Sequence, residues 1–586
     1  MDKFAENDLP NKTIRRIPRS VWLFTLLWFA LNWAQANGTE LIGDEAYYWY
    51  YSLDLSWAYF DHPPMVALFV YMGRQLLSGA LGVRLLTVLS GALCIPLLWL
   101  LLDERKPDRR KICLFIGIVS SVVLFHAFGF IATPDSPLLI FSLLFYLSYR
   151  RFVEKAGWWP AVWLGLSMAL LLYSKYQGVL VIGFVLLSNR RMLLNRRFFF
   201  SALLALLFCL PHIAAGVQIG FPSITYQLIG RARLHPYRWE YFWTYLTSPF
   251  LILGPFMAVP FLWAVFRYRR RNAMDAAMQF VFLGVFSFFL WVSLHRRVEA
   301  HWTAPILIPA MYLGYRFFAQ PHRRAKWIYG LSIPTIVLLL GARLVVAADF
   351  LPIDLEFYGR KTWIAAVNQI SKKLPVIFEN TYYHAAKYGF YSGEMTYSFD
   401  NDSYRKSQYD LRDDEGRFWN QKVFYIVGDS SAAALRKGYA PLQIDRKQQQ
   451  WYYKVYPNFY SAQKLEIRLD SVPTTFEVGR EITLQARIYN PYDHVVYFNR
   501  NAMPISLSAF WLNRGVYKAQ RWDQRRIRRK VKIVPPVTQM IGHSEIEVQI
   551  QFKALEKKGN YLLCFPFQFG DIPGGFNSKR YKVQIN

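Results

Sequence analysis

The sequence predicts a polytopic α-helical membrane protein with about eleven spans, followed by an extracytoplasmic α/β domain and a β-sandwich. Three observations predict this fold class. Residues 20–346 form a series of apolar runs separated by short polar links. That pattern stops after residue 346, and residues 347–586 mix helix and strand signals. The mean hydropathy of +0.12 is low for a chain made only of membrane helices, so a membrane part and a soluble part share the sequence unevenly.

Composition excludes several classes of protein. The chain has 586 residues, which exceeds one ordinary core and indicates several domains. Aromatic residues make up 18%, which excludes a disordered or collagen-like chain. Four cysteines, three of them inside apolar runs, exclude a disulfide scaffold. The usual nucleotide-binding, zinc-peptidase and thiol-redox motifs do not occur.

The membrane domain is predicted to cover residues 20–346, after a cytoplasmic N-terminus at 1–19. Its spans are assigned from apolar runs of up to about 20 residues, the length that crosses a bilayer. The predicted membrane helices are 20–36, 82–102, 112–132, 136–150, 158–174, 177–189, 198–217, 246–266, 276–294, 301–318 and 327–346.

The net charge of +30 is concentrated in alternate links of the membrane domain. The basic links are 12–19, 105–111, 150–155, 190–197, 267–271 and 323–326. Short basic loops mark the cytoplasmic side, which predicts a multi-pass protein of the plasma (inner) membrane with an inside N-terminus and an outside C-terminal region. Much of the charge is therefore an orientation signal, and no nucleic-acid partner is expected. A cleavable signal peptide ending at Ala36 is the alternative for the first run, and it leaves the following loop outside as well.

Two soluble domains are predicted after the membrane part. Residues 347–461 carry an amphipathic helix at 361–374 and buried strands at 375–378 and 422–427, which indicates a small α/β domain. Residues 462–586 alternate in strand fashion between turn signals, which indicates an immunoglobulin- or fibronectin-like β-sandwich. Its basic segment 521–532 is either a solvated strand or loop, or a surface for anionic lipid or glycan.

The first external loop gathers the acids expected to do chemistry. Residues 43–64 hold Asp44, Glu45, Asp54 and Asp61 among many aromatic residues. Aromatic residues collect at membrane interfaces, and a carboxylate there can serve as a base toward a hydroxyl. The structural alternatives are that Asp44 caps a helix beginning at Glu45, and that Asp61 caps one beginning at the following prolines.

Other polar residues lie at helix ends on the same predicted face. Asp135 follows Thr133-Pro134 and could simply cap a helix. Lys175 is a lone cation at a helix end and could snorkel to the interface. Glu299 and His301 open a later helix and belong either to a donor site or to the interface.

The long link 218–245 is unusually basic for the external side. It contains Arg231, Arg233, His235 and Arg238 among aromatic residues. Phosphate capture is one function for these cations, and binding of lipid headgroups is the alternative. His235 is also a candidate metal ligand.

Two motifs of the first loop resemble a known family. Gly43-Asp-Glu-Ala-Tyr-Tyr-Trp49, followed by Tyr59-Phe-Asp-His-Pro-Pro64, resembles the first-loop signature of bacterial relatives of the protein O-mannosyltransferases (glycosyltransferase family 39). The aminoarabinose lipid A transferases belong to the same GT-C superfamily. The resemblance spans roughly residues 20–320, and it implies many membrane helices, a catalytic acid in the first external loop and a lipid-phosphate sugar donor.

The resemblance also implies roles for individual residues. Asp44 matches the catalytic carboxylate, with Glu45 beside it. Asp61 matches a metal ligand of the aminoarabinose branch, which makes a divalent metal ion the one cofactor implied; that branch has Lys where this sequence has His62. The family further places a functional acid at Asp135 and uses a Lys at the position of Lys175 for the lipid phosphate.

The predicted function is a membrane glycosyltransferase that moves a sugar from a polyprenyl-phosphate donor to an extracytoplasmic acceptor, with inversion. The acceptor is lipid A or lipopolysaccharide, another glycan or a protein hydroxyl. Asp44 deprotonates or orients the acceptor, while Lys175 and the arginines of 231–238 neutralise the departing phosphate. With a phosphate as acceptor, Asp44 acts mainly by positioning.

Two other function classes remain open from the sequence. A transporter or flippase of lipid-linked sugars is the first, although transporters place ionisable sites near the bilayer midplane and these acids lie at helix ends. A membrane-anchored binding protein is the second, and it explains the tail but not the spans.

Overall fold

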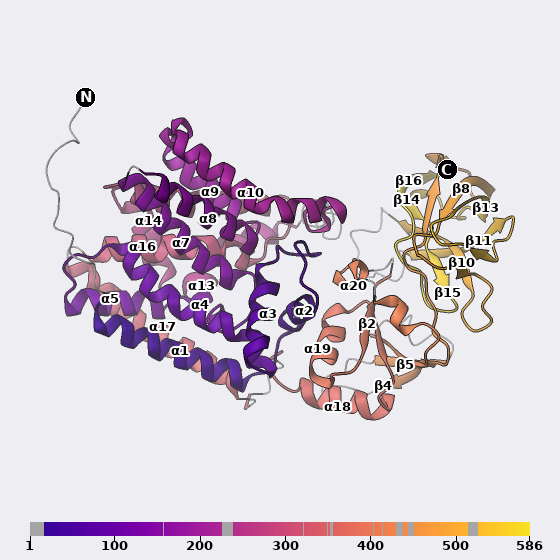
Figure 1. The fold of residues 1–586 in the computed structure, drawn as a ribbon, viewed down its shortest axis with the longest axis horizontal. Coiled ribbons are helices and arrows are strands. Elements are labelled where there is room, and N and C mark those ends of the chain that lie inside the picture. Colours follow the sequence, from indigo (N-terminus) through magenta and orange to yellow (C-terminus); the bar gives the residue numbers. More distant parts are fainter. Residues whose placement is uncertain are drawn as a thin grey trace. The chain divides into compact units, whose positions relative to one another are not determined.

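A computed structural model describes residues 17–155, 157–225, 238–319, 322–348, 350–351, 355–401, 404–412, 414–428, 438–442, 451–513 and 526–586. The chain divides into two compact units, Met1–Tyr358 and Gly359–Asn586 (Figure 1). The first unit is helical, and the second combines two larger sheets with a few short helices. In the described residues, the four cysteines form no disulfide bond.

The helical unit places its elements in this order: α1 (Arg19–Gly38), α2 (Gly43–Ser52), α3 (Met65–Leu76), α4 (Gly79–Leu102), α5 (Arg109–Ser120), α6 (Val123–Ala127), α7 (Asp135–Glu154), α8 (Trp158–Ser174), α9 (Gly178–Ser188), η1 (Arg190–Leu194), α10 (Arg196–Gln218), α11 (Pro222–Thr225), α13 (Glu240–Leu253), α14 (Ala258–Arg267), α15 (Ala273–Ser293), η3 (Ala300–Ile306), α16 (Leu307–Phe318) and α17 (His322–Ala347). Neighbouring helices pack α1 on α4, α4 on α7, α7 on α8 and α8 on α10. Figure 1 shows α17 beside α1 and α5, and both pairs are in contact.

Within the described residues, four helices are long and apolar enough to cross a membrane: α4, α10, α15 and the 325–347 part of α17. The pair α13 and α14 makes a fifth candidate, with a 100° bend between its halves. The chain is therefore a multi-pass membrane protein, but helix length and composition do not confirm the predicted count of eleven spans. Several predicted spans are short helices, such as α9 with 11 residues, or are broken.

Two predicted spans are interrupted for local reasons. The run 112–132 divides into α5 and α6 at Ser121. The run 246–266 divides at Gly254, whose φ of +111° is accessible mainly to glycine. A Cβ on Gly254 would lie 2.5 Å from the Ser121 carbonyl oxygen, so the two breaks touch each other. The helix α3 was not among the predicted spans.

The first sheet of the second unit has five strands in the order β2-β1-β3-β5-β4. Its strands are β1 (Val376–Glu379), β2 (Thr396–Phe399), β3 (Val423–Val427), β4 (Ala440–Leu442) and β5 (Trp451–Tyr456), with helices α18 (Arg360–Ser371), α19 (Tyr382–Ser392), α20 (Gln408–Leu411) and η4 (Glu415–Phe418). The strand β1, which lies between β2 and β3, runs parallel to both neighbours and is buried throughout, as continuous apolar strands in α/β sheets are.

The second sheet has nine strands, along the path β6-β8-β13-β11-β10-β14-β16-β7 with β15 paired to β10. These strands, with the separate pair β9 and β12, are β6 (Glu466–Leu469), β7 (Thr475–Phe476), β8 (Glu481–Tyr489), β9 (Val496–Tyr497), β10 (Ile505–Asn513), β11 (Arg526–Val534), β12 (Gln539–Met540), β13 (Glu545–Lys553), β14 (Gly559–Cys564), β15 (Phe567–Phe569) and β16 (Tyr581–Ile585). β8 alternates buried and exposed residues, the pattern that predicted strands here.

The strand β11 explains why this sheet is continuous. Its residues up to Val531 pair with β10, and its residues from Lys532 pair with β13. The sequence predicts a sandwich of two separate sheets. In the structure, β11 pairs with strands on both sides and joins all of these strands into one hydrogen-bonded sheet. Part of the basic segment 521–532 lies in β11, and its residues 521–525 lie outside the described residues.

Candidate active site

The first external loop is a folded structure with a buried aromatic core. The ring of Tyr51 stacks on Tyr59 with centroids 4.5 Å apart, and the Tyr59 hydroxyl donates to the Asp54 carbonyl oxygen at 3.2 Å. The Tyr51 hydroxyl donates to Asp61 Oδ2 at 3.3 Å. Most tyrosines of this loop are buried, and its exposed apolar residues are Leu53, Leu55 and Trp57. The aromatic residues therefore form the core of the folded loop. The sequence predicts only that they lie at the membrane interface.

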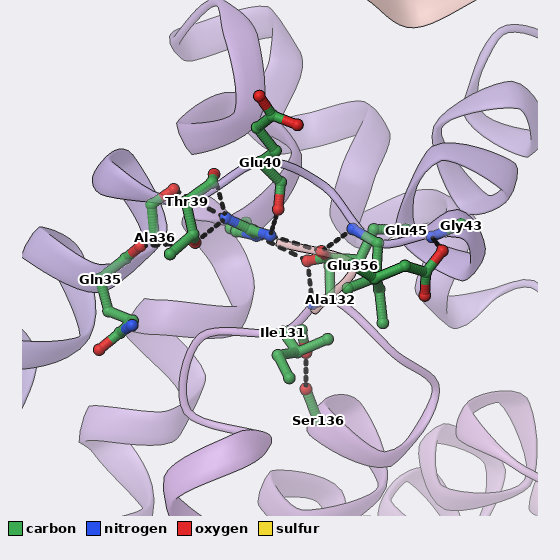
Figure 2. A network of polar contacts seen from close by, with 12 residues as sticks. Gln35, Ala36, Thr39, Glu40, Gly43, Glu45, Ile131, Ala132, Ser136 and Glu356 are labelled. Carbon is green, nitrogen blue, oxygen red and sulfur yellow. Dashed lines mark hydrogen bonds and ion pairs between the residues drawn. The ribbon is translucent and has the colours of Figure 1, made fainter. Parts of the chain in front are cut away.

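Glu45 forms the centre of a buried polar network (Figure 2). Its carboxylate binds Arg84 of α4 through two contacts, Nε to Oε1 at 2.7 Å and Nη2 to Oε2 at 2.5 Å, and both side chains are fully buried. Oε1 also accepts from the Ala132 amide at 2.8 Å, and Oε2 accepts from the Ile42 amide at 3.0 Å. The network thus ties α2, α4 and the segment before α7 together.

Arg84 extends the network to the end of α1. Its Nη1 donates to the carbonyl oxygens of Ala36 and Thr39, each at 2.9 Å, and its Nη2 donates to the Glu40 carbonyl oxygen at 2.8 Å (Figure 2). Carbonyl oxygens at a helix C-terminus lack partners within the helix, and a guanidinium satisfies several of them at once. Arg84 was missed in the sequence, although a lone arginine in an apolar helix is a signal for a functional or structural partner.

Asp44 and Glu45 occupy different environments although they are adjacent. Asp44 is exposed in the first turn of α2, which begins at Gly43, so Asp44 is not the helix cap that the sequence allowed. Glu45, predicted as a catalytic residue beside Asp44, is instead enclosed with both oxygens hydrogen-bonded.

Asp135 and Lys175 form a second buried ion pair. The Lys175 Nζ lies 2.7 Å from Asp135 Oδ1, and the two side chains are 4% and 3% exposed. Asp135 lies in the first turn of α7 and Lys175 directly follows α8, so each charge also interacts favourably with its helix dipole. Burial excludes the alternative that Lys175 snorkels to the interface. Neither residue is the N-cap, which is Pro134 for α7.

His62 lies where the predicted site residues converge. Burial lowers the pKa of His62 to about 4, and the nearby charge of Asp61 opposes this shift. Lys175, Asp135 and His301 also act on the pKa of His62. Residues from the first loop, α7, the end of α8 and η3 therefore lie close enough to interact electrostatically. At neutral pH the His62 ring is uncharged.

The remaining predicted site residues are at the edge of this cluster or outside the described residues. Glu299 Oε1 lies 3.2 Å from Arg297 Nε, in an exposed pair just before η3. His301 is exposed at the start of η3, and Arg238 is exposed before α13. The predicted phosphate ligands Arg231 and Arg233 and the predicted metal ligand His235 lie outside the described residues.

A metal site at Asp61 remains a prediction. The described parts of the chain contain no group of three or more His, Cys, Asp or Glu residues arranged to hold a metal ion. One oxygen of Asp61 accepts from Tyr51, which gives this acid a structural contact in the loop. The described residues therefore do not by themselves fit a metal ion.

His212 is a second residue that the sequence analysis missed. Its Nδ1 donates to the Trp57 carbonyl oxygen at 2.6 Å, and its ring lies 6.1 Å from Tyr173 and 6.0 Å from Tyr176. A lone histidine in the apolar α10 was the available signal. The contact fixes the first loop against the ends of α8 and α10.

Part of the chain matches a known protein family. Residues 61–214 match the family described as dolichyl-phosphate-mannose-protein mannosyltransferase. The predicted family resemblance is confirmed. The matched segment contains Asp61, His62, Asp135 and Lys175. Among curated proteins, none matches the chain.

Solved structures show the same fold. The crystal structure of ArnT from Cupriavidus metallidurans in the apo state has a TM-score of 0.55 and 14% identity, over 74% of this chain and 97% of that one. The structure of the same protein bound to undecaprenyl phosphate has a TM-score of 0.52 and 15% identity, over the same shares of each chain. At these identities the likeness concerns the fold alone, and the chain has an ArnT-like fold.

Proposed function

We propose that this chain is an integral-membrane glycosyltransferase that transfers a sugar from a polyprenyl phosphate to an acceptor on the external side. The observation that carries the proposal is the convergence of Asp61, His62, Asp135 and Lys175, four residues of the family-matched segment, beside the first loop. The ArnT structure with undecaprenyl phosphate, which has the same fold, supports a polyprenyl-phosphate donor.

The proposed reaction is a direct displacement at the anomeric carbon. The acceptor hydroxyl oxygen forms a bond to that carbon while the bond from the carbon to the phosphate oxygen breaks, so the configuration inverts. Asp44 takes the hydroxyl proton, because it is the exposed acid of the pair at the start of α2. The polyprenyl phosphate leaves with one more negative charge than it had in the donor.

Lys175 is the proposed partner for that developing charge. An ammonium has three donors, and one of them binds Asp135. Asp135 fixes the place of this ammonium at the end of α8, because the Lys175 Nζ lies 2.7 Å from Asp135 Oδ1 in a buried ion pair. The negative charge on the leaving phosphate develops in the transition state. A fixed cation that stabilises this charge therefore raises kcat.

Glu45 is the proposed positioning residue for Asp44. The four hydrogen bonds to the Glu45 carboxylate hold the first turn of α2 against α4 and Ala132. Asp44 precedes Glu45 by one residue, so this anchor sets the place of the Asp44 carboxylate. The acceptor class (lipid A or lipopolysaccharide, another glycan, or a protein hydroxyl) belongs to the proposal.

The decisive experiment is transfer of sugar from a defined polyprenyl-phosphate donor by the purified full-length protein, with mass-spectrometric detection of the product. Asp44→Asn should lower kcat by about a hundredfold or more while donor binding persists. The matched control is Asp54→Asn, which removes an exposed acid from the same loop and should leave turnover unchanged. Near-normal turnover in folded Asp44→Asn protein would exclude Asp44 as the base.

The donor-phosphate role of Lys175 is tested without leaving a buried charge unpaired. The double variant Lys175→Gln with Asp135→Asn keeps a hydrogen bond but removes both charges, and should lower kcat/KM for the donor by about tenfold or more. The control is Lys111→Gln with Glu104→Gln. This 2.8 Å pair joins Glu104, which follows the end of α4, to Lys111 of α5, beside the link 105–111 that is predicted to lie on the other face. Equal effects of the two double variants on kcat/KM would argue for a structural role of the Lys175–Asp135 pair.

Donor binding and translocation of the donor without formation of product would favour the flippase class.

A further inference from the structure

A basic cavity lies at the ends of α14 and α16, apart from the candidate active site. Its volume is about 540 Å³, and its lining includes Arg267, Arg269, Arg271 and Arg316. The first three arginines end α14 or follow it, and Arg316 lies in the last turn of α16. The two helices pack against each other.

Helix geometry places this cavity at the other membrane face from the active site. Glu299 and His301 lie at the start of η3, which runs directly into α16. The 7 residues of η3 and the 12 residues of α16 rise by about 14 and 18 Å, which together match the hydrocarbon thickness of about 30 Å. Arg316 is therefore separated from the active site by about one bilayer core, whatever the orientation of the chain.

The arginines of the cavity have few acidic partners among the described residues. Asp275 Oδ1 lies 3.8 Å from Arg316 Nε. Asp275 is fully buried, and its oxygens accept from the hydroxyls of Tyr312 and Tyr268 and from the Arg271 amide at 2.9, 3.2 and 3.0 Å. The exposed guanidinium groups of Arg267 and Arg269 enter no ion pair among the described residues.

The cavity also has an apolar wall. Trp263 is 43% exposed and Phe266 is 65% exposed, and both line it beside the arginines. The Trp263 ring packs on Phe317 with centroids 5.0 Å apart, which links α14 to α16. Tryptophan is enriched at the headgroup level of membranes. An anionic lipid headgroup would bind the arginines while its acyl chain packs on this apolar wall. A free anion would contact the arginines alone.

We propose that this cavity binds the phosphate-bearing headgroup of an anionic membrane phospholipid. Arginines bind phosphate oxygens through paired hydrogen bonds, and basic pockets between membrane helices suit such headgroups. The lipid bridges α14 and α16 at the face opposite the active site. Arginines in a short link can act as an orientation signal without binding anything. These arginines also line a cavity of about 540 Å³, which is large enough for a lipid headgroup.

The test is a titration of delipidated full-length protein with phosphatidylglycerol, followed by native mass spectrometry, with phosphatidylcholine and inorganic phosphate as parallel probes. Phosphatidylglycerol should bind, and Arg267→Gln with Arg269→Gln should weaken it by about tenfold or more. Arg267→Lys with Arg269→Lys should recover part of the affinity, because charge remains but the paired geometry is lost. These variants alter exposed side chains, so folding is checked by size-exclusion chromatography.

The matched control removes the same charge elsewhere. Arg190 and Arg191 are exposed in η1, lie outside this cavity and belong to another basic link, so Arg190→Gln with Arg191→Gln should leave the affinity within about twofold. Equal weakening by both doubles would overturn the proposal in favour of a general charge effect. Phosphatidylcholine binding as tightly, or inorganic phosphate displacing the lipid at similar concentrations, would overturn it as well.

Discussion

At the scale of single residues, the two acids at the start of α2 lie on different sides of that helix. Successive residues of an α-helix point about 100° apart, so Asp44 and Glu45 cannot share one environment. Glu45 points to Arg84 and is fully buried, whereas Asp44 is exposed. Two adjacent acids with the same chemistry thus divide into a fixed anchor and an exposed acid that can act on an acceptor.

Arg84→Met should destabilise the helical unit strongly. It leaves Glu45 as a buried, unpaired charge, and breaking such a pair costs about 3–5 kcal/mol. Arg468→Met, which breaks an exposed pair with Glu466, should lower stability far less, because solvent screens this pair. Thermal unfolding of detergent-solubilised protein measures both. Adding Glu45→Gln to Arg84→Met should recover part of the loss, and no recovery would mean that the charge is not the cause.

His62 should make stability depend on mildly acidic pH. Its pKa of about 4 lies below the ordinary value of 6.5, so the unfolded chain binds a proton that the folded protein excludes. Stability from this residue is complete above pH 6.5 and falls as pH drops toward 4, by at most about 1.4 kcal/mol per pH unit. His62→Gln should therefore flatten the decline of stability between these two pH values. An unchanged profile in His62→Gln protein would contradict the assignment.

At the scale of elements, several helices are short or broken. Gly254 allows the 100° bend between α13 and α14 because its backbone has a positive φ and approaches Ser121 closely. The short helices α2 and α3 and the turn at η3 likewise place polar residues at one face. Continuous spans would carry these residues into the apolar interior.

Gly254→Ala should destabilise the protein by about 1–3 kcal/mol, because a side chain is strained at this φ and would collide with Ser121. The control is Gly341→Ala in α17, where a Cβ meets nothing within 4 Å. Alanine has the higher helix propensity, so this change should be neutral or stabilising by up to about 1 kcal/mol. Thermal unfolding of both variants in the same detergent distinguishes them. Equal stability would show that the bend does not need glycine.

At the scale of the whole molecule, the boundary between units lies at Tyr358, beyond the predicted end of the membrane domain at 346. The reason is a set of contacts from the intervening segment. Glu356 Oε1 accepts from the Gly43 amide at 3.0 Å, and the Phe357 carbonyl oxygen accepts from the Glu40 amide at 2.8 Å. This segment therefore belongs to the first-loop structure.

The second unit should fold as 359–586 and not as 359–461. Glu415 of η4 accepts from the Tyr492 hydroxyl at 2.6 Å, and the Tyr456 hydroxyl donates to Asp571 at 2.7 Å. Removing 462–586 leaves both groups without these partners and uncovers apolar surface. We expect a cooperative unfolding transition for 359–586, and aggregation or a midpoint lower by several degrees for 359–461. Equal midpoints by circular dichroism would show that the five-stranded sheet is independent.

The sequence by itself determined the membrane character and the first-loop motif, and it singled out Asp135 and Lys175 as candidate site residues. Local signals suffice for these, because a charge within or beside an apolar run is costly and hence informative. Only the tertiary structure decided that Lys175 pairs with Asp135, that Glu45 binds an arginine in another helix, and that a span breaks at Gly254. Each of these depends on contacts between segments far apart in the chain, and no local window of sequence contains both partners.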